Sequence, residues 1–171
     1  MGAEAVSDGP TAALRPALPG DTPVLAAIAQ AAIFELTGDD YDEDQQEAWA
    51  AAAGDEEALA ARLADQLTLV ATRGGIPVGF IALADNRLVD QLYVHPDVAG
   101  EGVGALLCDA IERLAAARGA KSLTVDASDT ALGFFQKRGY VPKHRNTVPR
   151  GGVWLGNTTM EKNVGEPDPI H

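Results

Sequence analysis

Apolar side chains recur at helical spacing in four parts of the chain. The clearest stripe lies within residues 103–118, where Val103, Leu107 and Ile111 repeat every four positions and Gly119 provides a stop. This pattern predicts a long helix whose apolar face is turned to the core. The other predicted helices cover residues 21–37, residues 42–64 with a break near Gly54, and residues 129–137.

The first of these helices is expected to begin at Asp21 or Thr22. Asp and Thr side chains accept hydrogen bonds from free N–H groups at helix N-termini, and Pro23 is tolerated in a first turn. Gly38 is expected to end the helix. Its apolar face would consist of Leu25, Ile28, Ala32, Ile33 and Leu36.

Short runs rich in β-favouring residues predict the strands. Leu67–Thr72 and Ile76–Ala84 are separated by a short turn with two glycines, which suits positive φ and predicts a hairpin. A strand–helix–strand crossover among further strands predicts an α/β domain with a mixed sheet. The further strands are expected at Thr11–Leu18, Arg87–Val94, Ser122–Asp126, Tyr140–Val148 and Gly152–Lys162.

Length and composition at the two ends predict the domain organisation. With 171 residues the chain is long enough for one well-buried core. Residues 1–10 are small, polar and turn-prone, and residues 163–171 contain two prolines without apolar periodicity. We therefore expect a single domain over residues 11–162 between two disordered tails.

Charge and cysteine content exclude several classes of function. The net charge of −12 would repel a phosphate backbone, so nucleic acid is not an expected partner. Apolar runs are interrupted well before the ~20 residues that a bilayer span needs, and no basic segment precedes an apolar one at the N-terminus. The single cysteine, Cys108, excludes an internal disulfide and a cysteine-based zinc site. We expect a cytoplasmic protein that binds neither membrane nor metal, with Cys108 in the core.

A glycine-rich loop carries the candidate chemistry. It reads Gly100-Glu101-Gly102-Val103-Gly104 and lies between a predicted strand and the N-terminus of the long helix. Free N–H groups and the helix dipole at such a position bind phosphate, and glycines allow close approach of a pyrophosphate. A capping turn without a ligand is the alternative. The spacing fits neither the dinucleotide fingerprint, G-x-G-x-x-G directly after the strand, nor the Gly-Lys-Ser/Thr of a P-loop.

The segment Tyr93-Val94-His95-Pro96 followed by Gly-x-Gly-x-Gly resembles the acetyl-CoA loop of the GCN5-related N-acetyltransferase (GNAT) superfamily. Residues 131–140 are similar to its second cofactor segment, and the resemblance extends over residues 14–162. Three separate blocks, around Tyr41–Ala50, Leu123–Ser128 and Arg150–Met160, resemble the YafP-like branch. The resemblance implies a mixed, mostly antiparallel twisted sheet of six to seven strands with about four flanking helices.

The resemblance also implies an activity: transfer of an acetyl group from acetyl-CoA to a primary amine, expected to belong to a small molecule, by direct attack in a ternary complex. A protein N-terminus or lysine is an alternative acceptor. A non-catalytic acyl-CoA-binding regulatory module is a second alternative, and a glycine-capped interaction domain that binds no cofactor is a third. A homodimer is possible by analogy with the superfamily.

The cofactor contacts implied by the resemblance fall on the following positions. Backbone groups of Leu92 and Val94 would pair with the pantetheine arm, Ser128 would hydrogen-bond it, and Phe135 would form a wall of the acyl site. The pyrophosphate would be held by Ala99, Gly100, Gly102, Val103, Gly104 and Ala105. Ala99 replaces a usual Gln or Arg and removes one side-chain contact. Phe135 replaces a frequent tyrosine acid, so Tyr93, Tyr140 or water would have to protonate the thiolate.

The amine needs a proton acceptor, because aliphatic amines are mostly protonated at neutral pH. The candidates are Glu35, Asp90 and Asp126, with a water relay as an alternative. His95 is expected to be structural. Tyr41, Trp49 and Tyr93 are expected to bind the acceptor, although core packing would also explain an aromatic pair on a helix.

Overall fold

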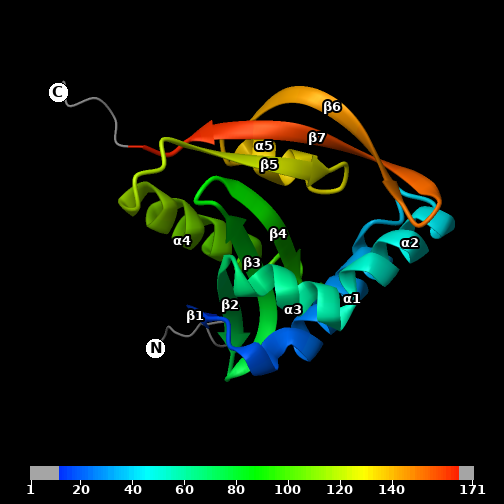
Figure 1. Ribbon diagram of the computed structural model, residues 1–171, viewed down its shortest axis with the longest axis horizontal. Coiled ribbons are helices and arrows are strands. Elements are labelled where there is room, and N and C mark those ends of the chain that lie inside the picture. The colour runs from blue at the N-terminus through cyan, green and yellow to red at the C-terminus, as the bar shows by residue number, and fades with distance from the viewer. Residues whose placement is uncertain (1–11, 166–171) are drawn as a thin grey trace, which may run out of the picture.

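The computed structural model describes residues 12–165, and within it a seven-stranded sheet forms the centre of the molecule (Figure 1). The strand order is β1-β2-β3-β4-β5-β7-β6, and every neighbouring pair is antiparallel except β4 and β5. The prediction of a mixed, mostly antiparallel sheet is confirmed. The strands are β1 Ala13–Pro16, β2 Leu67–Arg73, β3 Ile76–Ala84, β4 Leu88–Val94, β5 Ser122–Ser128, β6 Val141–Arg150 and β7 Val153–Asn163.

Five α-helices accompany the sheet, one more than the approximate number expected. The break near Gly54 divides the second helical region into α2 and α3, and each half has its own aspartate cap, Asp42 and Asp55. Two short 3₁₀ turns, Pro19–Asp21 and Pro96–Val98, precede α1 and α4. The helices are α1 Thr22–Leu36, α2 Glu43–Ala53, α3 Glu56–Ala64, α4 Val103–Ala117 and α5 Leu132–Lys137.

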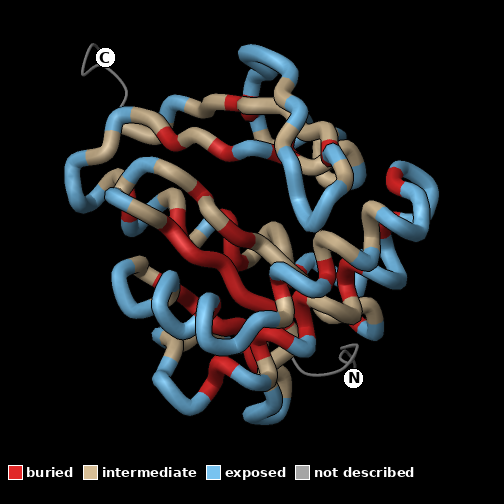
Figure 2. Tube along the Cα trace, turned by 45° about the vertical axis from the view of Figure 1, so that its right-hand side comes forward, coloured by how far each residue is buried: buried red, intermediate tan, exposed pale blue. Residues whose placement is uncertain are grey.

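The two faces of strands β2 to β4 bury two separate apolar clusters, as the red segments of Figure 2 show for the centre of the molecule. Val70 and Phe80 point to the side covered by α1 to α3. Leu69 and Ile81, one position away in each strand, point to the side covered by α4. Burial of each such side chain contributes about 1.5–3 kcal/mol. This two-sided packing makes β2, β3 and β4 a rigid floor for the neighbouring site.

Strands β4 and β5 separate soon after they meet. They pair only at Leu88↔Thr124 and Val89↔Val125. On the other edge of β4, Leu83 pairs with Val89 and Ala82 with Gln91, so Asp90 is the extra residue of a β-bulge. A bulge bends its strand and increases the local twist. Beyond Asp90, therefore, β4 turns away from β5 and leaves an open wedge in the sheet.

Asp21 stands at the expected N-cap position of the first helix, but the hydrogen bond expected from its side chain is not made. Helix α1 begins at Thr22, but the Asp21 side chain makes no cap hydrogen bond to it. Its carboxylate instead accepts two hydrogen bonds from Arg15, at 2.7 and 2.9 Å, and one from the N–H of Leu18 at 2.7 Å. These contacts lower the pKa of Asp21, with the Arg15 hydrogen bonds as the main cause. The Asp21 carboxylate is therefore bound by Arg15 on β1 and does not cap the helix.

Strand β7 continues one residue into the predicted C-terminal tail. Asn163 still belongs to β7, and the N–H groups of Val164 and Gly165 donate to the carbonyl of Lys121. The predicted N-terminal tail and the remainder of the C-terminal one lie outside the described residues. Cys108 is fully buried, as expected, and burial raises the pKa of its thiol to about 12.

Candidate active site

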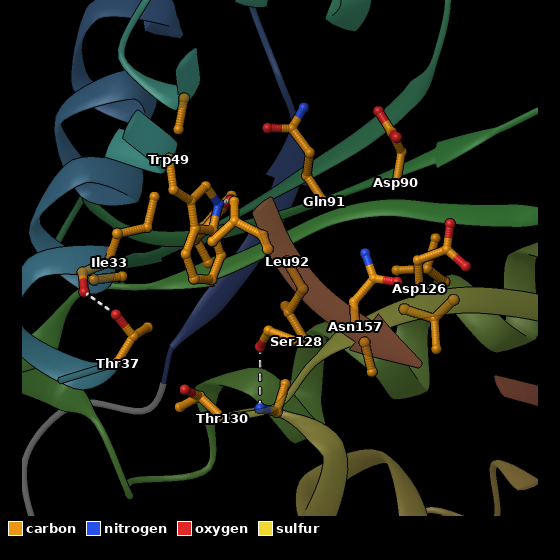
Figure 3. A pocket seen from close by; sticks show the side chains of 18 of the residues that line it. Ile33, Thr37, Trp49, Asp90, Gln91, Leu92, Asp126, Ser128, Thr130 and Asn157 are labelled. Carbon is orange, nitrogen blue, oxygen red and sulfur yellow. Dashed lines mark hydrogen bonds between the residues drawn. The ribbon is translucent and has the colours of Figure 1, made fainter. Parts of the chain in front are cut away.

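A cleft of about 390 Å³ occupies the wedge between β4 and β5 (Figure 3). Its walls come from α1, α2, the separated parts of β4 and β5, the start of α5 and the β6–β7 hairpin. Apolar side chains such as Ile33, Leu92 and Phe135 cover much of the wall. The polar lining residues are Thr37, Arg62, Asp90, Gln91, Asp126, Ser128, Thr130, Arg150 and Asn157.

Three aromatic residues form one connected group at the α2 side of the cleft. The Tyr41 and Trp49 rings meet edge to face with centroids 5.3 Å apart, and Trp49 Nε1 donates to the Tyr93 hydroxyl at 2.9 Å. The Tyr41 hydroxyl donates to the carbonyl of Gly156 at 2.7 Å and accepts from the N–H of Asp129 at 2.9 Å. All three residues line the cleft. These contacts hold α2 against β4 and the segment before α2 against β7, and they also shape the wall of the cleft.

The surroundings keep both tyrosine hydroxyls neutral. Burial raises the pKa of Tyr41 and that of Tyr93. The Tyr93 oxygen accepts from Trp49, and no hydrogen bond within residues 12–165 uses its own proton. Tyr93 therefore presents an O–H donor at the cleft.

The structure brings two of the three predicted carboxylates into the cleft. Asp90 Oδ2 accepts from Arg62 Nη2 at 2.6 Å and from Gln66 Nε2 at 2.9 Å. Asp126 is exposed, and its Oδ1 accepts from the Thr159 hydroxyl at 2.6 Å. In Figure 3, Asp126 lies next to Asn157, on the β5 and β7 side. Each carboxylate keeps one oxygen free of these bonds.

Glu35, the third candidate, does not line the cleft. The face of α1 that lines the cleft carries Ile33 and Leu36. At 100° per residue, Glu35 is rotated off this face, and its side chain is exposed. Sequence spacing alone placed it near the helix end without fixing which way it points.

The glycine loop lies beside the cleft rather than in its lining. Gly100 and Gly102 have φ of 79° and 89°, and a Cβ on either would meet nothing within 4 Å. These glycines are therefore required by the left-handed backbone, and the space above them is open. The first hydrogen bond of α4 runs from the N–H of Leu106 to the carbonyl of Gly102, so the N–H groups of Val103, Gly104 and Ala105 have no acceptor in the helix.

The loop contains one acidic residue, Glu101, whose charge is neutralised by a basic residue outside the loop. Arg73, at the end of β2, makes an ion pair with Glu101 at 2.7 Å. Arg73 Nε is buried and has no partner among the described residues. The position of Ala99, also in the loop, is exposed and contributes no polar side chain. Because Arg73 and Glu101 neutralise each other, the positive character at the loop comes from the helix N-terminus.

The remaining predicted residues fall into cleft-lining and structural groups. Ser128 lines the cleft, and its Oγ accepts from the N–H of Ala131 at 3.1 Å. Phe135 is only 2% exposed and stacks edge to face with Phe134 and Tyr140, yet it still contributes to the cleft wall. His95 Nδ1 accepts from the N–H of Asp97 at 3.0 Å and so stabilises its own turn.

Tyr140 is excluded as a proton donor in the cleft. Its hydroxyl donates to Glu112 Oε2 on α4 at 2.9 Å, and the residue does not line the cleft. Burial and the Glu112 charge raise the pKa of this hydroxyl. Of the two tyrosines considered as substitutes for the missing acid, only Tyr93 reaches the cleft.

Sequence reasoning assigned no role to Arg62, Gln91 or Arg150, although all three line the cleft. Gln91 is buried, and its Nε2 has no partner in the described part of the chain. Arg62 and Arg150 come from α3 and from the end of β6, far apart in sequence. The signal that would have found Gln91 is its polarity within an otherwise apolar strand face. No local signal marks the two arginines.

The sheet opens between two parallel strands, next to a glycine-rich helix N-terminus whose free N–H groups can bind phosphate. The family model described as Acetyltransferase (GNAT) domain matches residues 37–164, and the chain belongs to this family. Membership makes it an acyltransferase with acetyl-CoA as acyl donor.

Individual relatives agree with this family. The chain is 32% identical to the uncharacterized N-acetyltransferase YafP of Escherichia coli K12 over 142 residues, which cover 83% of this chain and 89% of YafP. The prediction of a YafP-like branch is thus confirmed. A GCN5-related N-acetyltransferase structure from Rhodopseudomonas palustris is 59% identical, with a TM-score of 0.87 over 94% of this chain and 99% of that one.

A more distant structure shares the fold. The PaiA N-acetyltransferase of Thermoplasma acidophilum, solved in complex with coenzyme A, is 19% identical with a TM-score of 0.74, over 90% of this chain and 99% of that one. Within residues 12–165, no helix has the length and apolar character required to cross a membrane.

Proposed function

We propose that this chain transfers the acetyl group of acetyl-CoA to the primary amine of a small molecule while both are bound. The observation that carries the proposal is the wedge between β4 and β5. It exposes the edge of β4, leads to the glycine loop on one side, and opens on the other into a cleft lined by Trp49, Asp126 and other polar groups. A cleft of about 390 Å³ suits a small acceptor better than a folded protein.

The residues at the loop fit the acyl donor. Open space above Gly100 and Gly102 would admit a pyrophosphate, and the free N–H groups of Val103, Gly104 and Ala105 would hold it together with the helix dipole. Leu92 and Val94 lie in the part of β4 that has no strand partner on the β5 side, so their backbone groups are free to pair with an extended arm. Ser128 and Phe135 would border the same arm.

On the acceptor side, Asp126 is our candidate for the group that takes the amine proton. It is exposed at the cleft, and Thr159 holds one of its oxygens while the other is free. Asp90 has a different role, because its carboxylate is bound to Arg62 and Gln66. We assign Asp90 to positioning Arg62.

Bound acetyl-CoA supplies an activated thioester, whose C–S bond breaks as the amide C–N bond forms and whose sulfur leaves with a proton. A backbone N–H on the open edge of β4 would stabilise charge on the acyl oxygen. Phe135 cannot donate the sulfur's proton, so Tyr93 or a water molecule would provide it. Tyr93 keeps its proton because burial raises its pKa, but its place beside Trp49 on α2 favours a role in acceptor binding, so water is our choice for the sulfur's proton.

A non-catalytic acyl-CoA-binding module remains the second candidate. It is favoured by Ala99 and Phe135, which replace a side-chain phosphate contact and a tyrosine acid. Turnover separates the two functions, since both require binding of acetyl-CoA.

The experiment measures acyl-donor binding and acetyl transfer separately. Thermal melting with acetyl-CoA at about 100 times its Kd should show stabilisation of about 2.7 kcal/mol. Acetyl transfer is then followed by thiol release and product mass with a panel of small amines, peptide N-termini and lysine peptides. Transfer to small amines supports the proposal. Binding without transfer to any acceptor would favour the regulatory module, and preferred transfer to peptides would favour a protein acetyltransferase.

A further inference from the structure

Two arginines reach the acceptor side of the cleft. Arg62 comes from α3, and Arg150 comes from the end of β6, beside the hairpin turn. Both line the same cleft as the Tyr93 hydroxyl. Asp90 pairs with Arg62, whereas Arg150 brings a positive charge that no described carboxylate pairs with, in a chain of net charge −12.

The guanidinium of Arg150 is available to a ligand. Its only hydrogen bond within residues 12–165 is from Nη1 to the carbonyl of the adjacent Pro149 at 3.0 Å, and no described carboxylate lies within ion-pair distance. The residue is exposed at the rim of the cleft. Most of the donors of its guanidinium are therefore free.

The second arginine is held in place while it keeps donors free. Arg62 uses Nη2 for its 2.6 Å ion pair with Asp90. Asp90 is itself fixed by the bulge of β4 and by Gln66. This contact anchors one nitrogen of the guanidinium and leaves the others for a ligand.

Tyr93 adds a third donor to the lining of the same cleft. Its oxygen already accepts from Trp49, so the hydroxyl can serve a ligand only by donating. Two guanidinium groups and one O–H donor form a set that matches an anion with several acceptor atoms. Arginine is the side chain best suited to a carboxylate, because its planar N–H groups match the two oxygens.

We infer that Arg150, Arg62 and Tyr93 bind a carboxylate of the acceptor, so that the acceptor is an amino acid or a similar small molecule with both an amine and a carboxylate. This inference rests on the proposed acetyl transfer. The amine of such a molecule would face Asp126 while its carboxylate faces the arginines. The cleft therefore offers complementary charge at both ends of a zwitterion.

The test compares matched acceptors that differ only at the carboxylate. The standard amino acids are assayed beside their carboxamides, with acetyl transfer measured as kcat/KM. The acids that react should exceed their carboxamides at least tenfold, since a charge-assisted contact of this kind is lost in the amide. Arg150→Gln should raise KM for the acid about tenfold or more and leave KM for the carboxamide and for acetyl-CoA unchanged.

Two further variants sharpen the result. Arg87→Gln removes the same charge from the exposed turn before β4, which does not line the cleft, and it should behave like the unaltered protein. Arg150→Lys keeps the charge but loses the planar fork, so it should restore part of the preference for acids.

Carboxamides or simple amines that react as well as the acids would overturn this inference and leave acetyl transfer standing. Equal effects of Arg150→Gln on acid and carboxamide would do the same. If acetyl-CoA raises the melting temperature but no acceptor is acetylated, the proposed function itself is overturned, and the carboxylate site with it.

Discussion

The two ends of the cleft are built from different parts of the polypeptide. The donor end, at the glycine loop, consists mainly of backbone: left-handed glycines, free N–H groups of α4 and the open edge of β4. The acceptor end consists of side chains from separate elements, including Trp49 on α2, Arg62 on α3 and Arg150 on β6. The donor end therefore depends on local conformation, whereas the acceptor end depends on tertiary packing.

This difference explains why relatives can share an acyl donor and differ in acceptor. A backbone cradle tolerates many side chains provided that the glycines keep their conformation. A pocket assembled from side chains of many elements changes with any one of them. We expect substitutions at the two ends to separate cleanly in their effects on binding of acetyl-CoA and of the acceptor.

Gly102→Glu should give the largest difference between the effect on acetyl-CoA binding and the effect on acceptor binding. It forces a Cβ into a left-handed position and adds a negative charge where a pyrophosphate would approach, and we expect acetyl-CoA affinity to fall about 100-fold or more. Titration calorimetry with acetyl-CoA measures this loss.

The matched control is Gly119→Glu, at the other end of α4. Gly119 has φ of 92°, is exposed and also has open space above it. Both variants should lose about 1–2 kcal/mol of stability from the backbone strain, but only the first should lose affinity. Equal affinity in the two variants would remove the proposed phosphate site.

Asp126→Asn should affect turnover without affecting binding. Loss of a proton acceptor lowers kcat by about 10²–10⁴-fold, and the melting shift with acetyl-CoA should stay the same. Asp85→Asn, in an exposed turn away from the cleft, serves as the isosteric control and should keep full activity. Unchanged kcat in Asp126→Asn would assign the proton transfer to another group or to water.

Tyr93→Phe should act at the acceptor end alone. It leaves Trp49 Nε1 without its acceptor, which we expect to cost about 1–2 kcal/mol of folding stability, and KM for the acceptor should rise. The affinity for acetyl-CoA should change little. A double-mutant cycle with Trp49→Phe, read by chemical denaturation, isolates the hydrogen bond from the loss of packing; a coupling energy of zero would contradict its role.

Glu101→Gln should give the smallest effect, at the donor end. It removes a negative charge from the loop and releases Arg73, so acetyl-CoA should bind about twofold more tightly, or about 0.4 kcal/mol. The gain should fall as salt is raised, because exposed charges are screened. Weaker binding in this variant would show that the Arg73–Glu101 pair orders the loop.

The donor end and the acceptor end also differ in how much of each could be predicted from the sequence. The strands, the long helix and the glycine loop follow from local patterns, and the structure has them close to the expected bounds. The Asp21 side chain does not cap α1 because Arg15 reaches it from β1. The rotation of α1 that keeps Glu35 out of the cleft lining is not encoded locally. Arg62 and Arg150 had no signal, because only the folded chain brings α3 and the β6–β7 hairpin to one cleft.

The short contact between β4 and β5 also has a mechanical consequence. Only two residue pairs, Leu88↔Thr124 and Val89↔Val125, join the two parts of the sheet through strand pairing. Rotation of the β5–β7 part against the β2–β4 part about this junction would disturb few strand hydrogen bonds, although both parts pack in one apolar cluster with α4. Amide hydrogen exchange should be faster at this junction than within β2 and β3, and binding of both substrates across the wedge should slow it. The short junction of β4 and β5, beyond which the cleft opens, would then also act as the hinge that sets the width of the cleft.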